Sequence, residues 1–353
     1  MLSMNSDAPQ QKFPWEGKPE EQHPKHLLFI SIDIIDSTEL KTESQKRKDK
    51  KSVWAKKLTN FLPYAPVLLV DNFNKALKQC PKIKNCPSQC LIENAKNSPQ
   101  IDVWKYIGDE VVLTSELKCL THAYLLIKAL QETLTTLNDE KAQAKKSGKT
   151  IIVKFKSTAW VAGFPMQNIE ILLPGNQGEI KDYIGPSVDL GFRLSKHATE
   201  RKIILSSSLV YLLVKGAFDL EKQFPIYSGG NIPLKGVENG HHPLFWVLPS
   251  GQKEPHDEIH YAPSQMEKIK PFLQAFFKGK IPPFILADEQ PSDEYCKKYS
   301  KTVTELSSLP CSIFFNRGEA RTGKKIEVSQ SENEGIDSIL ESVSEKVTVS
   351  TKK

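Results

Sequence analysis

Short apolar runs and helix-type repeats of apolar residues follow one another along most of this chain. The run Leu27–Asp33 is apolar and favours β structure, which predicts a buried strand. Cap-type residues and an early acid follow at Asp36–Glu39, so we expect a helix to begin there. Apolar residues recur at helical spacing between Leu120 and Leu137, which predicts an amphipathic helix.

The other predicted elements are a mixture of strands and helices. In chain order they are a helix near Pro66–Leu77, strands at Ile101–Tyr106 and Val111–Leu113, a strand at Ile151–Val161, a helix opening at Pro186, a strand at Lys202–Ser206, a helix at Leu209–Lys215, and strands at Pro233–Lys235 and Pro243–Leu248. The stretch Gly163–Gly178 is expected to be irregular. This order predicts an α+β fold with a mixed sheet.

Changes in composition divide the chain into a main domain and less ordered ends. Residues 1–25 are polar and contain proline, so a flexible N-terminal tail is expected. The main domain is expected over residues 26–250, with an insert at about 41–100. A small C-terminal extension is expected over 251–316. Residues 317–353 are rich in Ser, Glu, Lys and Thr, which predicts a disordered tail.

Composition and charge exclude some classes of protein. Of the 353 residues, 39% are hydrophobic and 25% are charged, as in an ordinary globular protein. The net charge of +6 suits a protein that handles phosphates. The basic stretches 41–57 and 145–149 lack interleaved aromatic residues, so no nucleic-acid partner is expected. The chain has neither an apolar run of roughly 18 residues nor a signal peptide, so we expect a cytoplasmic protein without membrane contact.

The six cysteines are too few to predict a disulfide scaffold. Cys80, Cys86 and Cys90 lie six and four residues apart in a polar stretch, which is not the paired spacing of a zinc site. Cys119 or His122 would have to supply a fourth ligand. The spacing therefore favours ordinary thiols over zinc.

Two carboxylates stand at the predicted ends of core strands. Asp33 ends the first strand, and Asp36 is the better cap for the helix that follows, which leaves Asp33 without a structural role. Asp109 lies in a Gly-Asp pair that also suits a tight turn. Two carboxylates at the ends of adjacent strands are suited to hold two hard cations for phosphoryl chemistry.

Four short motifs lie in order between residues 26 and 249. They are Phe29-x-x-x-Asp33-Ile34-x-x-Ser37-Thr38, Lys105-x-x-Gly108-Asp109, the run Asp182–Leu194, and Leu234-Lys235-Gly236-Val237 followed by Pro243–Val247. Together they resemble the motifs of class III nucleotidyl cyclases. The resemblance implies a mixed, mainly antiparallel sheet with helices packed on it, and a homodimer with two equivalent sites.

The resemblance also implies a role for each matched residue. Asp33, Asp109 and the carbonyl group of Ile34 would bind two divalent cations, Mg²⁺ or Mn²⁺. The partner chain would hold the nucleoside triphosphate. Its residues would be Lys105 and Asp182 at the base, Asp189 at the ribose, Arg193 at the pentavalent phosphate and Lys235 at the β- and γ-phosphates.

Departures from the usual motifs narrow the resemblance. Asp189 stands where the family usually has Asn, and it adds a negative charge near the triphosphate. The run Asp189–Arg193, the motif Lys-x-x-Gly-Asp-Glu and the long insert resemble the pyrimidine cyclases of bacterial Pycsar antiphage defence. Those enzymes make cCMP or cUMP, and the product opens a separate effector. The resemblance therefore implies a pyrimidine nucleotide cyclase that makes a second messenger.

The predicted base-reading pair, Lys105 and Asp182, indicates a weak preference among the nucleotide bases. Lys105 is a donor and ionised Asp182 is an acceptor, which suits cytosine or adenine slightly better than uracil. Excluding a purine requires bulk in the pocket, and Tyr106 and Tyr183 are candidates, although a core or interface position is the simpler interpretation for each.

Three other functions share some of these residues. An adenylyl cyclase, making cAMP, would share every motif except the unusual helix sequence. A diguanylate cyclase is disfavoured because Ile107–Val111 only half matches its Gly-Gly-Asp/Glu-Glu-Phe signature. A non-catalytic nucleotide-binding module is disfavoured because both metal aspartates, Arg193 and Lys235 are all present.

Overall fold

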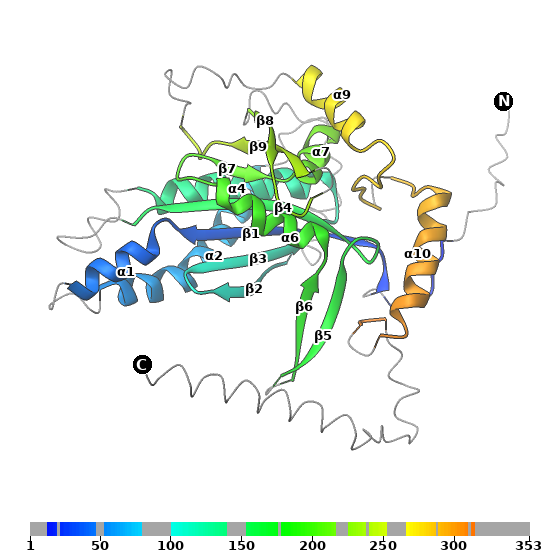
Figure 1. Ribbon diagram of the computed structural model, residues 1–353, viewed down its shortest axis with the longest axis horizontal. Helices are drawn as coiled ribbons and strands as arrows, with labels where there is room; N and C mark the ends of the chain where they lie inside the picture. Colours follow the sequence, from blue (N-terminus) through cyan, green and yellow to red (C-terminus); the bar gives the residue numbers. More distant parts are fainter. Residues whose placement is uncertain are drawn as a thin grey trace, which may run out of the picture.

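A seven-stranded mixed sheet lies at the centre of the structure, in the order β2-β3-β1-β4-β7-β9-β8 (Figure 1). Its strands are β1 (Lys25–Ile34), β2 (Ile101–Ile107), β3 (Glu110–Glu116), β4 (Phe155–Phe164), β7 (Ile203–Leu205), β8 (Tyr227–Pro233) and β9 (His241–Val247). All neighbouring strands are antiparallel except β4 and β7, which are parallel. The predicted α+β fold with a mixed, mainly antiparallel sheet is confirmed.

The described part of the chain comprises most of the predicted main domain and parts of the predicted N-terminal tail and C-terminal extension. This computed structural model describes residues 13–19, 22–46, 53–79, 100–139, 153–175, 178–216, 225–237, 240–252, 266–286, 289–309 and 312–314. Cys80, Cys86 and Cys90 and the predicted tail 317–353 lie outside these residues. No helix within these ranges is long and apolar enough to cross a membrane.

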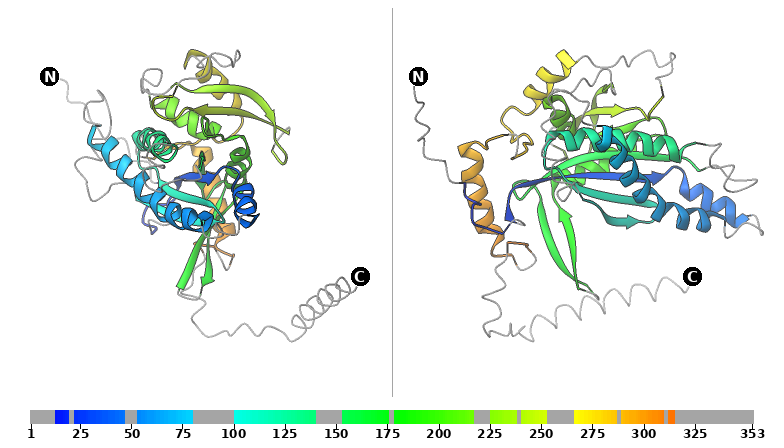
Figure 2. Two further views of the ribbon diagram at one scale, coloured as in Figure 1. Left: turned by 90° about the vertical axis from the view of Figure 1, so that its left-hand side faces the viewer. Right: turned by 180° about the vertical axis from the view of Figure 1, so that it is seen from behind.

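Alternating side chains along the strands give the sheet two different faces. On one face the alternate β1 residues Leu28, Ile30, Ile32 and Ile34 join the main core. This face is covered by α2 (Val53–Gln79), α4 (Leu120–Leu137), α7 (Ser207–Lys215) and α9 (Met266–Phe276), and Figure 2 shows α2 and α4 together on that side. Phe29 and Trp160 point to the other face, where α6 (Pro186–Leu194) packs. The predicted helices at 120–137 and from Pro186 are confirmed.

Helix α2 is longer than the sequence predicts. Its described range begins at Val53 and includes Pro63 and Pro66 in its interior, where proline normally interrupts a helix. Side chains at helical spacing along it, such as Phe61, Leu69 and Phe73, are buried in the main core. Burial of this apolar face against α4 offsets the local cost of the two prolines.

Strands β5 (Ile169–Gly175) and β6 (Gly178–Ile184) form a separate antiparallel pair. This pair, called the arm below, projects away from the sheet in all three ribbon views (Figures 1 and 2). The prediction that Gly163–Gly178 is irregular is therefore wrong. Strand β6 supplies a hydrogen-bonding partner for β5, which the local sequence of β5 does not reveal.

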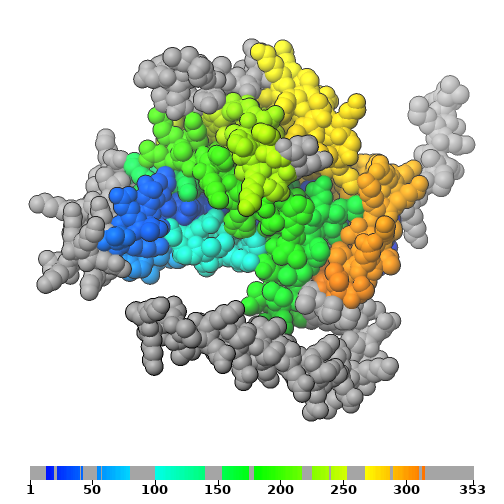
Figure 3. Space-filling model, viewed as in Figure 1, coloured from blue at the N-terminus to red at the C-terminus, as the bar shows by residue number. Residues whose placement is uncertain are grey.

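The base of the arm is fixed by charge and by the C-terminal extension. Glu170 is 2% exposed, and its carboxylate lies 2.5 Å from Lys25 Nζ and 2.6 Å from Lys181 Nζ. Ile171 pairs with Asp182 of β6 and forms a bridge to Ser312. Figure 3 shows the extension, in orange, against the arm.

The C-terminal extension packs against the N-terminal segment through aromatic side chains. Helix α10 (Asp293–Leu306) was not predicted, although Ser292 caps it by accepting a hydrogen bond from Tyr295 N at 3.2 Å. Trp15 is buried edge-on against Tyr295 and Tyr299 of this helix. Residues from the two predicted ends of the chain thus share one small core.

Candidate active site

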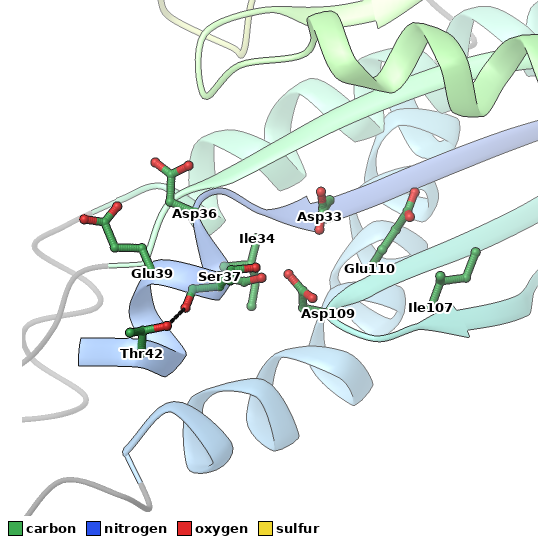
Figure 4. A pocket seen from close by; sticks show the side chains of 10 residues that line it. Asp33, Ile34, Asp36, Ser37, Glu39, Thr42, Ile107, Asp109 and Glu110 are labelled. Carbon is green, nitrogen blue, oxygen red and sulfur yellow. Dashed lines mark hydrogen bonds between the residues drawn. The ribbon is translucent and has the colours of Figure 1, made fainter. Parts of the chain in front are cut away.

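An open pocket of about 750 Å³ lies where β1, the β2–β3 turn and helix α1 (Ser37–Lys46) meet (Figure 4). It is lined by Asp33, Ile34, Asp36, Ser37, Thr38, Glu39, Thr42, Ile107, Asp109 and Glu110. Five of these residues carry carboxylates, so the pocket, called the acidic pocket below, favours cations. It brings together Asp33, Ile34 and Asp109, as the sequence predicts for a metal site.

Strand pairing places Asp33 among charged side chains. Asp33 pairs with Glu110 of β3 on one side and with Lys156 of β4 on the other. Residues directly opposite in antiparallel strands lie on the same face, here the face of Phe29. Lys156 Nζ lies 3.3 Å from Asp33 Oδ2. Burial raises the pKa of Asp33 above its ordinary value; Lys156 opposes this rise and Asp109 adds to it.

Asp109 reaches the pocket from the turn between β2 and β3. Gly108 precedes it with φ of 66°, a left-handed conformation that glycine adopts without strain. Lys41 Nζ of α1 lies 3.1 Å from Asp109 Oδ1. Ile34 is the third predicted metal-binding residue. It lines the pocket, while its side chain belongs to the main core.

Glu110, Lys41 and Lys156 were not singled out from the sequence. Burial raises the pKa of Glu110, and its carboxylate accepts a hydrogen bond from the Ser31 hydroxyl. Lysines are frequent in the sequence around both Lys41 and Lys156, but nothing local shows which of them face the carboxylates. That information lies in the pairing of β1 with β4, which are far apart along the chain.

The donor set of the acidic pocket fits Mg²⁺ or Mn²⁺. Carboxylate and carbonyl oxygens are the ligands these hard ions prefer. In the described part of the chain no three or more His, Cys, Asp or Glu side chains surround one point, and His122 and Cys119 are buried elsewhere in the core. Magnesium is commonly bound by one or two carboxylates together with water and substrate phosphates, so two aspartates and a carbonyl group suit it.

Lys105 and Asp182 form an ion pair with an Nζ–Oδ1 distance of 2.6 Å. A shift of register between Val103 and Lys105 marks a bulge in β2, which turns both Trp104 and Lys105 to the face of Phe29. Lys105 Nζ lies 4.5 Å from the centre of the Trp104 ring. The backbone N–H of Tyr183 donates to Asp182 Oδ1 at 2.8 Å, which orients the carboxylate.

The two tyrosines named from the sequence are placed differently from the Lys105–Asp182 pair. Tyr183 is buried among Phe29, Trp104 and Phe164, and burial raises its pKa. Tyr106 is 53% exposed and pairs with Val111, whose side chain belongs to the main core. The structure therefore places Tyr106 on the face opposite to Lys105.

Arg193 and Lys235 are joined by a hydrogen bond. Arg193 Nη1 donates to the backbone carbonyl of Lys235, in the turn that follows β8. Gly236 has φ of 75°, and a Cβ atom there would overlap the Arg193 guanidinium. The backbone conformation favours glycine here, and a Cβ atom would also displace the end of the Arg193 side chain. The Lys235 side chain is exposed.

Helix α6 carries Arg193 and rests directly on an aromatic side chain. A Cβ atom on Gly191 would overlap the Trp160 ring, which explains the glycine in the sequence Asp-Leu-Gly-Phe-Arg. Phe192 packs on Trp160 at a ring distance of 5.3 Å. Asp189 is exposed one turn before Arg193, on the same side of the helix.

Comparisons with known proteins found structural similarity only. No family model matches the chain, and no curated protein matches it. The adenylyl cyclase CyaB from P. aeruginosa is 16% identical with a TM-score of 0.40, over 64% of this chain and 94% of that one. The guanylyl cyclase Cya2 is 13% identical with a TM-score of 0.42, over 67% and 96%. The guanylate cyclase domain of RhGC from Catenaria anguillulae is 12% identical with a TM-score of 0.38, over 64% and 97%.

Proposed function

We propose that this protein is a class III nucleotidyl cyclase. It converts a pyrimidine nucleoside triphosphate, CTP or UTP, to the 3′,5′-cyclic monophosphate and pyrophosphate. The observation that carries the proposal is the acidic pocket, which combines Asp33 and Ile34 of one segment with Asp109 of another. The Lys105–Asp182 and Arg193–Lys235 pairs, formed in the same chain, support it.

Asp33, Asp109 and the Ile34 carbonyl group would hold two divalent cations, Mg²⁺ or Mn²⁺, in the acidic pocket. Such ions, when bound, lower the pKa of the ribose 3′-hydroxyl and place positive charge beside the triphosphate. Partial burial raises the pKa of Asp33, and repulsion from the neighbouring Asp109 adds to the rise. Bound cations would relieve this repulsion.

The other residues bind the nucleotide and stabilise charge. The 3′-oxygen attacks the α-phosphorus in line, the bond from that phosphorus to the pyrophosphate oxygen breaks, and the hydroxyl proton passes to solvent. Charge builds on the phosphoryl oxygens, and Arg193 offers them a planar, permanently charged donor. Its hydrogen bond to the Lys235 carbonyl holds it in place before the nucleotide arrives. Lys235 binds the β- and γ-phosphates.

Two chains complete each site in a homodimer. The residues that line the acidic pocket do not include Lys105, Asp182, Arg193 or Lys235. A partner chain supplies these groups, and two equivalent sites result. Exposed apolar side chains on the arm, Ile180 at 57% and Ile184 at 47%, favour such an association.

The choice of a pyrimidine rests on the sequence Asp189–Arg193 and its resemblance to Pycsar cyclases. The Lys105–Asp182 pair presents a donor and an acceptor, which favours cytosine slightly over uracil. Asp189 orients the ribose. The product, cCMP or cUMP, serves as a second messenger in antiphage defence and acts on a separate effector that it gates.

Incubation of the purified protein with Mn²⁺ and each of the four nucleoside triphosphates tests the proposal. We expect CTP or UTP to give the cyclic monophosphate, identified by mass spectrometry, and pyrophosphate in equal amount. If ATP is cyclised well ahead of both pyrimidines, the protein is an adenylyl cyclase. If no triphosphate is cyclised by the dimer, the assignment as a cyclase is wrong.

A further inference from the structure

Each candidate metal-binding aspartate already has a lysine partner. Lys156 Nζ lies 3.3 Å from Asp33 Oδ2, and Lys41 Nζ lies 3.1 Å from Asp109 Oδ1. The two lysines come from different elements, Lys156 from β4 and Lys41 from α1. Without metal, two ammonium groups therefore neutralise part of the charge of the acidic pocket.

Lys156 is the more firmly placed of the two. Its backbone pairs directly with Asp33, and the next residue, Ser157, donates a hydrogen bond to the Ser31 carbonyl at 2.6 Å. The side chains of Lys156 and Asp33 are each 25% exposed, so their ion pair is partly shielded from solvent. Lys41 lies on a helix and also stands 5.8 Å from the Trp54 ring, a second place for its ammonium group.

Lys156 Nζ occupies the Oδ2 side of the Asp33 carboxylate, so a divalent cation competes with the ammonium group for this oxygen. A cation that takes Oδ2 displaces Lys156 from it, and the two positive groups then repel each other across a few ångströms. The negative charge of a triphosphate removes that repulsion and gives the displaced ammonium group a new partner. Binding of metal and of nucleotide is thereby coupled, and the coupling is the same in both directions.

On the basis of the proposed function, we propose that Lys156 is a positioning residue that makes divalent-cation binding at Asp33 depend on the triphosphate. In the free protein Lys156 holds Asp33 and keeps cation affinity low. In the complex Lys156 turns from Asp33 to a phosphate oxygen. Metal-free protein is thus poised to bind the metal–nucleotide complex rather than the metal alone.

Binding of Mn²⁺, followed by its electron paramagnetic resonance signal, tests this role without turnover. The titration is done on the full chain with and without 3′-deoxy-CTP, which lacks the attacking hydroxyl group. Lys156→Met removes the ammonium group, and Lys156→Gln is the second variant if the first fails to fold. Lys154→Met is the matched control, because Lys154 is the neighbouring lysine and pairs with Glu200 at 3.2 Å instead.

We expect Lys156→Met to bind Mn²⁺ roughly threefold to tenfold more tightly than the wild type without nucleotide, the range of one partly exposed ion pair. The gain in Mn²⁺ affinity on adding 3′-deoxy-CTP should shrink by a similar factor, and Lys154→Met should match the wild type. Equal Mn²⁺ affinity in wild type and both Lys156 variants overturns the inference and leaves the metal site standing. If neither wild type nor variant binds Mn²⁺ with or without nucleotide, the proposed function fails as well.

Discussion

The two groups of candidate site residues are held in different ways. In the acidic pocket, partly buried carboxylates at strand ends and turns line an open cavity, and a single lysine pairs with each of the two aspartates Asp33 and Asp109. The second group, which we name the cationic half, comprises Lys105, Asp182, Arg193 and Lys235. It is built on buried aromatic rings and on glycines that leave no room for a side chain.

Under the proposed function, this difference matches what each group would bind. A metal ion brings strong, weakly directional attraction, so carboxylates can adjust to it when it arrives. A phosphate group or a base edge is bound through directional hydrogen bonds, so the protein groups that bind it must be fixed beforehand. Charge therefore organises the acidic pocket, and packing organises the cationic half.

Removing charge from the acidic pocket should have the largest effect. Asp33→Asn or Asp109→Asn should lower cyclisation by roughly a thousandfold or more, because the hard-cation ligand is lost. Circular dichroism and the thermal midpoint should show a folded chain. Wild-type turnover in either variant would show that these carboxylates do not bind the metal.

Disturbing the packing of the cationic half should give the second-largest loss of turnover. Gly236→Ala forces a Cβ atom into the Arg193 guanidinium at φ of 75°, so we expect turnover to fall by roughly 30-fold to 100-fold. Gly240→Ala is the matched control, since Gly240 has φ of 66° in the same turn region and open space at its Cβ position. Both variants should lose roughly 1–2 kcal/mol of unfolding free energy in urea. Equal turnover in the two variants would mean that Arg193 need not be fixed.

The base-reading pair should give a smaller, selective effect. Asp182→Lys replaces the acceptor by a donor, which should cost the preferred base roughly 1–3 kcal/mol through an unpaired polar group. A competition assay with all four triphosphates measures the change, and Mn²⁺ affinity should stay as in the wild type. If relative base preference is unchanged while turnover falls equally for all four, Asp182 does not read the base.

The smallest expected effect is a change of unfolding free energy with pH that arises from two buried histidines. Burial lowers the pKa of His122 to about 3 and that of His242 to about 4, so both are neutral in the folded chain. The unfolded chain protonates them near pH 6.5, so their contribution to stability is complete above that pH and is lost as the pH falls toward 4. Unfolding in urea at pH 7, 6 and 5 should show this fall. A His242→Gln variant should show a shallower dependence, and an unchanged slope would contradict the assignment.

Local sequence predicts the elements better than it predicts their partners. The strand that ends at Asp33, the helix at 120–137 and the helix from Pro186 follow from local signals and are found. The arm was missed because β5 is stabilised by β6 rather than by its own sequence. Lys156 was missed for the same reason, since only the register of β1 against β4 brings it to Asp33.

The motifs identified more of the residues that lie together in the candidate site than the hydrophobic pattern alone. Asp33 and Asp109 line one pocket, as expected of a metal site. The bulge that turns Lys105 toward Asp182 depends on strand pairing that no short motif encodes. The pairing also explains why Tyr106, next to Lys105 in sequence, faces the other side of the sheet.

Mixing two inactive variants tests the central claim most directly, that one chain supplies the acidic pocket and its partner the cationic half. Asp33→Asn and Arg193→Ala are purified separately, mixed, and shown to exchange subunits. In a mixed dimer one of the two sites keeps both Asp33 and Arg193. We expect cyclisation to recover to about a quarter of the wild-type rate at equal mixing, because half of the dimers are mixed and each has one intact site. No recovery despite demonstrated exchange would contradict a site shared between two chains.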